Sequence, residues 1–209
     1  MSEYRKHYDE QTARKYQQRK PRKDRAEMRL IDRAFALIDK NQRVLDAPCG
    51  GGRMLLHLAQ AGYTVCGADL SEGMVQIARE NLARHRVDCA VERQDLEKLT
   101  YPDKHFDTIL CFRLFHHFPT PELRQRIIRE LCRVAGRNVL LSYFSPLSGT
   151  SVYRKVRAAL GGRRAAKHAT SLAEVAGYFT ASGFRLVKDF AQTPLLHTLH
   201  LAVFERSAP

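Results

Sequence analysis

A run of glycines with an acid just before it is the part of this sequence best suited to binding chemistry. The segment reads Asp46-Ala-Pro-Cys-Gly50-Gly-Gly52-Arg53. Glycines at the turn between a strand and a helix let a ligand approach the backbone at the carboxyl end of a sheet. Because Asp46 stands beside this turn, we expect a ligand that carries positive charge at the end facing it.

The spacing of these glycines differs from two common nucleotide-binding loops. Dinucleotide folds use Gly-x-Gly-x-x-Gly, whereas here Gly50-x-Gly52 is followed by Leu55 in place of the third glycine. A P-loop would continue with Gly-Lys-Ser or Gly-Lys-Thr, which is absent after these glycines. A pyrophosphate would also be repelled by Asp46. The sequence therefore disfavours both kinds of nucleotide site.

Two further acids stand where the next two strands are expected to end. A carboxylate in the position of Asp69 can accept hydrogen bonds from both hydroxyls of a ribose. Asp95 can accept from an adenine amino group while the neighbouring Leu96 covers the ring. Each acid alone is typical of a solvated strand end, but three of them around one glycine loop indicate a nucleoside-containing ligand.

Short apolar segments that alternate with helical patterns position these residues. We expect strands at 43–47, 64–69, 88–95, 106–112, 138–144, 184–191 and 198–206. Helices are expected at 26–39, from Gly52 to near Gly62, from Ser71 to about Arg84, from Thr120 to Gly136, and from Ser171 to Gly183. Such alternation predicts a mostly parallel sheet covered on both faces. The last two strands are too close in sequence for a crossover helix, so we expect them to pair antiparallel.

Together these motifs resemble the class I S-adenosylmethionine-dependent methyltransferases, and within them the ubiquinone-biosynthesis-like (methyltransferase type 11) branch. The loop Asp46-x-Pro48-Cys-Gly50-x-Gly52 is a variant of the family's acidic-x-Gly-x-Gly-x-Gly signature, with Pro48 in place of the first glycine. The other matching motifs are Gly67-Ala-Asp-Leu-Ser, Asp95-Leu96, Phe106-Asp-Thr-Ile-Leu and Ser182-Gly-Phe. The resemblance extends from about residue 29 to residue 206.

The resemblance implies an α/β, Rossmann-like fold whose seven-stranded sheet has the order 3-2-1-4-5-7-6, with strand seven antiparallel. It implies S-adenosylmethionine (SAM) as cofactor and S-adenosylhomocysteine (SAH) as product. Asp46 and the loop glycines would surround the methionine part, Asp69 would hold the ribose, and Asp95 with Leu96 would hold the adenine. The cofactor residues expected in this way are Asp46, Ala47, Pro48, Gly50, Gly52, Asp69, Leu70, Asp95, Leu96 and Phe112.

The segment after the fourth strand, 111–118, is where this family keeps residues that face the methyl acceptor. His116 or His117 is a candidate general base near neutral pH, although a histidine here also serves to pack or hydrogen-bond the loop. Arg113 can bind an acidic acceptor or pair with a nearby acid. The (Asp/Asn)-Pro-Pro-(Tyr/Phe) signature of nucleic-acid amino methyltransferases is absent, and Cys111 lies inside a predicted strand, so methylation of nucleic-acid bases is disfavoured.

Excess positive charge is concentrated in two segments. The formal net charge is +13; residues 1–25 hold nine basic and four acidic side chains, and residues 151–168 hold six basic and no acidic ones. Such runs are typical of a solvated face, but two of them on a nearly neutral body also suit an anionic partner. Within a basic insertion at 145–170, the candidate substrate-binding residues are Arg154, Arg157, Arg163 and Arg164.

The 209 residues predict one methyltransferase domain, 1–209, with a basic helical arm at 1–25. Five cysteines without CxxC spacing indicate reduced thiols, a cytoplasmic protein and no metal site. Neither a signal peptide nor a transmembrane segment is expected, although peripheral membrane contact stays open. We expect methyl transfer to a small-molecule or lipid-type acceptor, with an RNA- or protein-directed methyltransferase and a non-catalytic regulatory protein as alternatives.

Overall fold

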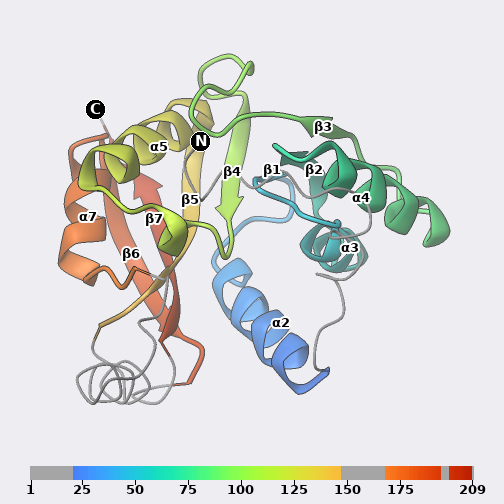
Figure 1. Cartoon of the computed structure of the whole chain (residues 1–209), viewed down its shortest axis with the longest axis horizontal. Helices are drawn as coiled ribbons and strands as arrows, with labels where there is room; N and C mark the ends of the chain where they lie inside the picture. The colour runs from blue at the N-terminus through green and yellow to red at the C-terminus, as the bar shows by residue number, and fades with distance from the viewer. Residues whose placement is uncertain (1–20, 147–167, 194–197, 209) are drawn as a thin grey trace.

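The computed structural model describes residues 21–146, 168–193 and 198–208 (Figure 1). Its seven strands form one sheet of order β3-β2-β1-β4-β5-β7-β6. They are β1 (Arg43–Asp46), β2 (Thr64–Asp69), β3 (Val91–Arg93), β4 (Phe106–Cys111), β5 (Ala135–Phe144), β6 (Phe184–Ala191) and β7 (Leu199–Arg206). The strands β1 to β5 pair in parallel, and β7 runs antiparallel to both β5 and β6. The predicted strand order and the antiparallel final hairpin are confirmed.

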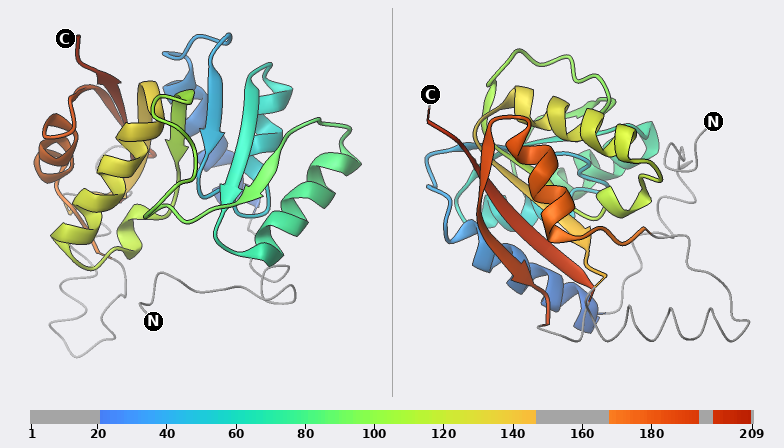
Figure 2. Two further views of the ribbon diagram at one scale, coloured as in Figure 1. Left: turned by 90° about the horizontal axis from the view of Figure 1, so that it is seen from above. Right: turned by 90° about the vertical axis from the view of Figure 1, so that its left-hand side faces the viewer.

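Helices cover both faces of this sheet (Figure 2). They are α2 (Pro21–Phe35), α3 (Arg53–Gln60), α4 (Glu72–Arg84), α5 (Pro121–Val134) and α7 (Leu172–Thr180), with a short 3-10 turn, η1 (Phe115–His117). Successive residues of a strand point to opposite faces, and the two halves of the core follow this rule. Leu110 and Leu140 pack with residues of α2, α3 and α4, whereas Ile109 and Leu141 pack with residues of α5 and α7.

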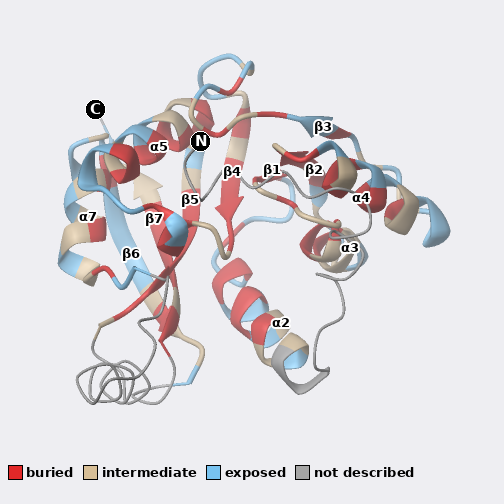
Figure 3. Ribbon diagram, viewed as in Figure 1, coloured by how far each residue is buried: buried red, intermediate tan, exposed pale blue. Residues whose placement is uncertain are grey.

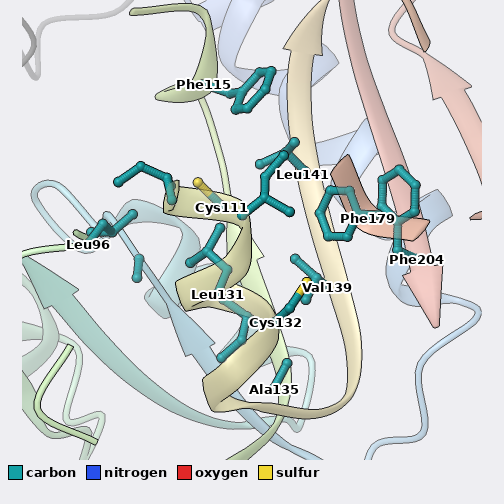
Figure 4. Packing of buried hydrophobic residues seen from close by; sticks show 14 of the residues in the cluster. Leu96, Cys111, Phe115, Leu131, Cys132, Ala135, Val139, Leu141, Phe179 and Phe204 are labelled. Atoms are coloured by element: carbon teal, nitrogen blue, oxygen red, sulfur yellow. The ribbon is translucent and has the colours of Figure 1, made fainter. Parts of the chain in front are cut away.

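Figure 4 shows the second of these clusters at close range. Leu131 and Cys132 of α5 and Phe179 of α7 face Val139 and Leu141 of β5. Phe179 also stacks on a ring of β7, that of Phe204, with 3.7 Å between the ring centroids. Figure 3 shows the matching buried stripe along α2 on the other face. The apolar residues that recur at helical spacing in the sequence thus pack against the sheet.

Three predicted helix starts are confirmed by their caps. The side-chain oxygens of Ser71, Thr120 and Ser171 each accept a hydrogen bond from a backbone N–H in the first turn of the helix that follows. Pro121 occupies the first position of α5, where its missing N–H costs no hydrogen bond. The chain enters each of these helices where the sequence predicts.

Gly136 does not end α5, and that prediction is wrong. The helix ends at Val134 and the chain passes directly into β5, which begins at Ala135. A Cβ atom on Gly136 would lie 3.3 Å from the carbonyl oxygen of Phe106. The glycine therefore permits close approach of two backbones rather than a left-handed helix cap.

The remaining differences concern segment ends. The third strand, expected at 88–95, is reduced to Val91–Arg93, because its parallel pairing with β2 involves only three residues at the sheet edge. The first helix begins at Pro21 and ends at Phe35, earlier than expected at both ends. Most of the predicted arm at 1–25 and of the basic insertion at 145–170 lies outside the described residues, and with it Arg154, Arg157, Arg163 and Arg164.

Candidate functional site

The glycine loop and the acids lie together at the carboxyl ends of β1 and β2. In this parallel pair Asp46 is in register with Gly67, so Asp69 ends β2 close beside the loop. The loop is fixed by its own backbone, since the N–H of Ala47 donates to the carbonyl of Leu110 at 2.9 Å. The N–H of Cys49 donates to the carbonyl of Ala68 at 2.8 Å. The segment after β1 is therefore attached to both neighbouring strands.

Asp69 organises this edge with its carboxylate. Its Oδ2 accepts from the N–H of Gly50 and its Oδ1 from the N–H of Ser71, each at 2.9 Å. Burial raises the pKa of this carboxyl above its ordinary value, while the backbone donors partly oppose the rise. A carboxylate has about four lone-pair positions, so two backbone bonds leave it able to accept from further hydroxyl donors.

Asp46 is the least satisfied charged group of the site. Its side chain is buried, and within the described ranges neither carboxylate oxygen has a hydrogen-bond partner. Burial raises the pKa of Asp46 well above its usual range, and the charge of Asp69 raises it further, whereas the guanidinium of Arg53 acts in the opposite direction. A buried, unpaired acid of this kind fits a ligand that brings a positive charge or N–H donors.

The two glycines of the loop serve different purposes. Gly52 has φ +78°, and a Cβ atom there would lie 3.1 Å from both Cα and Cβ of Ala78, so the loop packs directly on α4. Gly50 has φ +52°, and a Cβ atom there would meet no described atom within 4 Å. The loop is thus closely packed on one side and open on the other, as a ligand cradle requires.

The other expected cofactor residues lie directly after the strands β1, β2 and β4. Ala47 is buried and is joined to the half-buried Pro48 by a cis peptide bond. Leu70, directly after β2, is half-buried, and Phe112, directly after β4, is buried. Each of them follows a central parallel strand, and their role toward a cofactor stays a prediction.

The segment expected to face adenine forms a tight loop after β3. Oδ1 of Asp95 accepts from the N–H of Glu97 at 3.0 Å, and Leu96 is buried in the core cluster on the α5 face. The buried Gln94 holds the loop closed, because its Nε2 donates to Thr100 Oγ1 at 2.8 Å and its Oε1 accepts from the N–H of Thr100. Sequence reasoning missed Gln94, since a lone glutamine after a strand carries no specific signal.

Arg113, which we expect to face the acceptor, is paired with an acid of the protein. Its guanidinium forms an ion pair with Glu27 of α2, whose side chain is fully buried. The backbone at Arg113 has φ +62°, and its N–H donates to Oγ of Ser142 on β5. From the sequence alone, the partner of Arg113 could be either an acidic acceptor or an acid of the protein. The sequence could not identify Glu27 as that acid, because the two residues are 86 positions apart.

The two histidines of η1 lie in different surroundings. The ring of His116 is buried and stacks on Phe144 with 4.0 Å between centroids and 5° between planes. The carbonyl of His116 accepts from the N–H of His168 at 2.9 Å. His117 is exposed, and its ring lies 4.3 Å from that of His116. Of the two, His117 is the one that a ligand from solvent can reach.

All five cysteines are free thiols. Burial raises the pKa of Cys89 and of Cys132 to about 12, and it also raises the pKa of the buried Cys49 and Cys111. Within the part of the chain that the structure describes, no group of side chains has the composition of a metal site. None of the helices described there has the length and apolar character that a membrane crossing requires.

Comparison with known proteins agrees with this geometry. The family described as "Methyltransferase domain" matches residues 44–138. The ubiquinone biosynthesis O-methyltransferase of Coxiella burnetii (strain Dugway 5J108-111) is 37% identical over 98 residues, which are 47% of this chain and 42% of that protein. The magnesium-protoporphyrin O-methyltransferase of Synechocystis sp. is 37% identical over 117 residues, 54% of this chain and 49% of that protein. The chain thus covers less than half of each of these relatives.

Solved structures show the same fold over most of the chain. Magnesium protoporphyrin IX methyltransferase from Synechocystis PCC 6803 with bound SAH has a TM-score of 0.76 at 23% identity, and the match covers 91% of this chain and 89% of that one. The PH0226 protein from Pyrococcus horikoshii has a TM-score of 0.73 at 19% identity, with 91% and 93% covered.

The sheet order, the glycine loop after β1 and the acids after β1 and β2 define a Rossmann-like methyltransferase fold. The domain match over residues 44–138, the relatives and the solved structures support the predicted resemblance to the class I S-adenosylmethionine-dependent methyltransferase superfamily.

Proposed function

We propose that the chain binds SAM at the carboxyl ends of β1 and β2 and transfers its methyl group to a small-molecule acceptor. The single observation that carries this proposal is the buried carboxylate of Asp46, which has no hydrogen-bond partner among the described residues and precedes the glycine loop. The methionine part of SAM brings an ammonium group and a sulfonium, which supply the donors and the positive charge that Asp46 lacks. A dinucleotide would bring a pyrophosphate, which the same acid repels.

Each further part of SAM has a matching group in this arrangement. Asp69, already fixed by two backbone N–H groups, accepts from the ribose hydroxyls. Asp95 accepts from the adenine amino group, with Leu96 beside the ring. The lining of the site is completed by Ala47, Pro48, Gly50, Gly52, Leu70 and Phe112.

When bound, SAM supplies a methyl group that is already activated for in-line displacement by a nucleophile. The residues of the chain then have to hold the acceptor in line and remove a proton where the acceptor is an alcohol or phenol. His117 is our candidate for that proton transfer, because it is exposed, whereas His116 is enclosed against Phe144. Arg113, neutralised by Glu27, shapes the acceptor side through its packing rather than as a free cation.

We propose O-methylation of a small anionic acceptor, in the ubiquinone-biosynthesis-like branch of the superfamily and in the cytoplasm. The relatives named above are O-methyltransferases of ubiquinone biosynthesis and of magnesium protoporphyrin, which supports a small acceptor. We propose that the whole chain forms one domain. Its basic insertion at 145–170 supplies positive charge for a carboxylate, a phosphate or an anionic lipid head group.

The test is methyl transfer by the purified full chain with SAM labelled in its methyl group. The acceptors are phenolic carboxylic acids, carboxyl-bearing tetrapyrroles, anionic lipid vesicles and RNA. We expect label in a small acid and none with the Asp69→Asn variant, because the cofactor then loses its ribose acceptor. Transfer to RNA alone, with a steep loss as salt rises, would favour the nucleic-acid reading of the basic segments. Binding of SAM without transfer to any acceptor would favour a regulatory role.

A further inference from the structure

The two halves of α2 are attached to the rest of the molecule by different forces. Its C-terminal half packs Leu30, Ile31 and Ala34, all fully or almost fully buried, into the core cluster on that face of the sheet. Its N-terminal half is attached by ion pairs of Asp24 and Glu27. Figure 1 shows α2 beside the end of the β4 arrow, which is the edge of the sheet where the candidate site lies.

Glu27 is the centre of this ion-pair network. Its side chain is fully buried; Oε2 lies 2.6 Å from Arg53 Nη2, and Oε1 pairs with Arg113 Nη1. Asp24, about one-third exposed, pairs with the other guanidinium nitrogen of Arg53. One buried carboxylate therefore joins two arginines, one through each of its oxygens.

These arginines belong to the segments that form the candidate site. Arg53 follows Gly52 directly and begins α3, while Arg113 follows the last residue of β4, Cys111, by two positions. Since β1 and β4 are neighbours in the sheet, Glu27 ties the glycine loop to the acceptor-side loop. Arg53 already acts on the site, because its charge lowers the pKa of Asp46 against the effect of burial.

We propose that Glu27 is a positioning residue of the cofactor site, which fixes Arg53 and Arg113 and balances their charge at the place where a sulfonium binds. The inference rests on the proposed binding of SAM. Among the described ion pairs, Glu27 is the only acid that pairs with Arg113. Without it, the Arg113 guanidinium, which is 12% exposed, is left as an uncompensated positive charge beside the site.

The charge-balancing role has a signature that a structural role lacks. SAM carries a positive sulfonium where SAH has a neutral thioether, so a change in local charge alters SAM binding and leaves SAH binding nearly unchanged. We expect Glu27→Gln to raise the ratio of the SAM dissociation constant to that of SAH by about 15-fold, as for one unit charge roughly 10 Å away at an effective dielectric constant near 20. Glu27→Asp retains the charge and should restore the ratio, even if it weakens the binding of both ligands.

The experiment is calorimetric titration of the full chain with SAM and with SAH. Asp32→Asn is the matched control, because Asp32 is an acid of the same helix that also bonds to α3, through His57 at 2.6 Å, but is 55% exposed. Its ratio should stay within about twofold of that of the unmodified protein. Arg113→Gln is the second test and leaves Glu27 paired with Arg53; it removes a positive charge and should lower the ratio severalfold.

The outcomes separate this inference from the proposed function. The role of Glu27 is supported if the ratio of the SAM to the SAH dissociation constant rises in Glu27→Gln, falls in Arg113→Gln and equals that of the unmodified protein in Glu27→Asp. If Glu27→Gln does not fold, the direction of the change in Arg113→Gln decides alone. Ratios that stay equal to that of the unmodified protein overturn the role of Glu27 while the proposed function stands. If the unmodified protein binds neither ligand, the proposed function itself fails.

Discussion

Replacing Asp46 by asparagine should make the ligand-free protein more stable while it weakens the binding of SAM. The carboxylate is buried, and within the described residues neither of its oxygens has a partner. Its ionised form therefore carries a desolvation cost that no hydrogen bond offsets. Asparagine has nearly the same shape and no charge, so it removes most of that cost. A residue kept for ligand binding at the expense of stability behaves in this way.

The expected gain is about 1–3 kcal/mol in the free energy of unfolding near pH 8, the usual range for relief of an unpaired buried polar or charged group. For a chain of 209 residues, this corresponds to a rise in melting temperature of roughly 2–4 °C per kcal/mol. The affinity for SAM should fall by about 10- to 150-fold, as for the loss of a hydrogen-bonded charge contributing about 1.5–3 kcal/mol.

The gain should depend on pH in a fixed direction. Burial raises the pKa of Asp46 in the folded state, so the folded protein binds the proton more tightly than the unfolded chain does. The original protein therefore loses stability as the pH rises from about 4, the ordinary value for aspartate, through the raised folded pKa. The gain in stability from Asp46→Asn should be small below about pH 4 and should reach its full size above the pKa of Asp46 in the folded protein.

Thermal unfolding of both proteins between pH 4 and pH 9, with calorimetry for SAM, measures these effects. The control is Asp88→Asn, an exposed acid before β3, which should change the stability by no more than about 0.5 kcal/mol. A lower melting temperature for Asp46→Asn at pH 8 would contradict this prediction, because it would mean that the carboxylate stabilises the ligand-free fold. An unchanged affinity for SAM would remove Asp46 from the cofactor site.

Three other predictions concern the same edge of the sheet. Asp69→Asn should weaken SAH binding by about 100-fold, because the ribose loses its charged acceptor; an unchanged dissociation constant in calorimetry contradicts that assignment. Gly52→Ala should destabilise the protein by about 1–3 kcal/mol in denaturant unfolding, since its Cβ would lie 3.1 Å from Ala78 at φ +78°; equal midpoints contradict it. The thiols of the half-buried Cys89 and the buried Cys132, whose pKa is raised to about 12, should react slowly with iodoacetamide in the native protein at pH 8, and rapid labelling seen by mass spectrometry would show that their pKa is not raised.

The sequence predicted the parts of this structure that depend on local signals. Asp46 and Asp69 could be placed together because the ends of neighbouring parallel strands meet at one edge of a sheet. The starts of α4, α5 and α7 followed from capping residues, and the final hairpin followed from a connection too short for a crossover helix. Each inference needed only a short window of sequence and a general rule of chain geometry.

Contacts between distant segments could not be predicted in this way. Glu27 is separated by 26 and 86 positions from the arginines that it joins, and in sequence it is one of several acids on a helix. Gly136 follows a helix and so matches the pattern of a helix cap, but its role is set by the backbone of Phe106 on the adjacent strand. Such roles arise from tertiary packing, which a single sequence does not encode in any local pattern.

Calorimetric titration of the purified full chain with SAH and SAM, with NAD as the comparison ligand, tests whether the edge formed by β1 and β2 binds SAM. We expect one site with a dissociation constant of about 1–100 μM for SAH and SAM, and no binding of NAD at the same concentrations. Absence of binding by both SAH and SAM at about 1 mM, or equal binding of NAD, would contradict it.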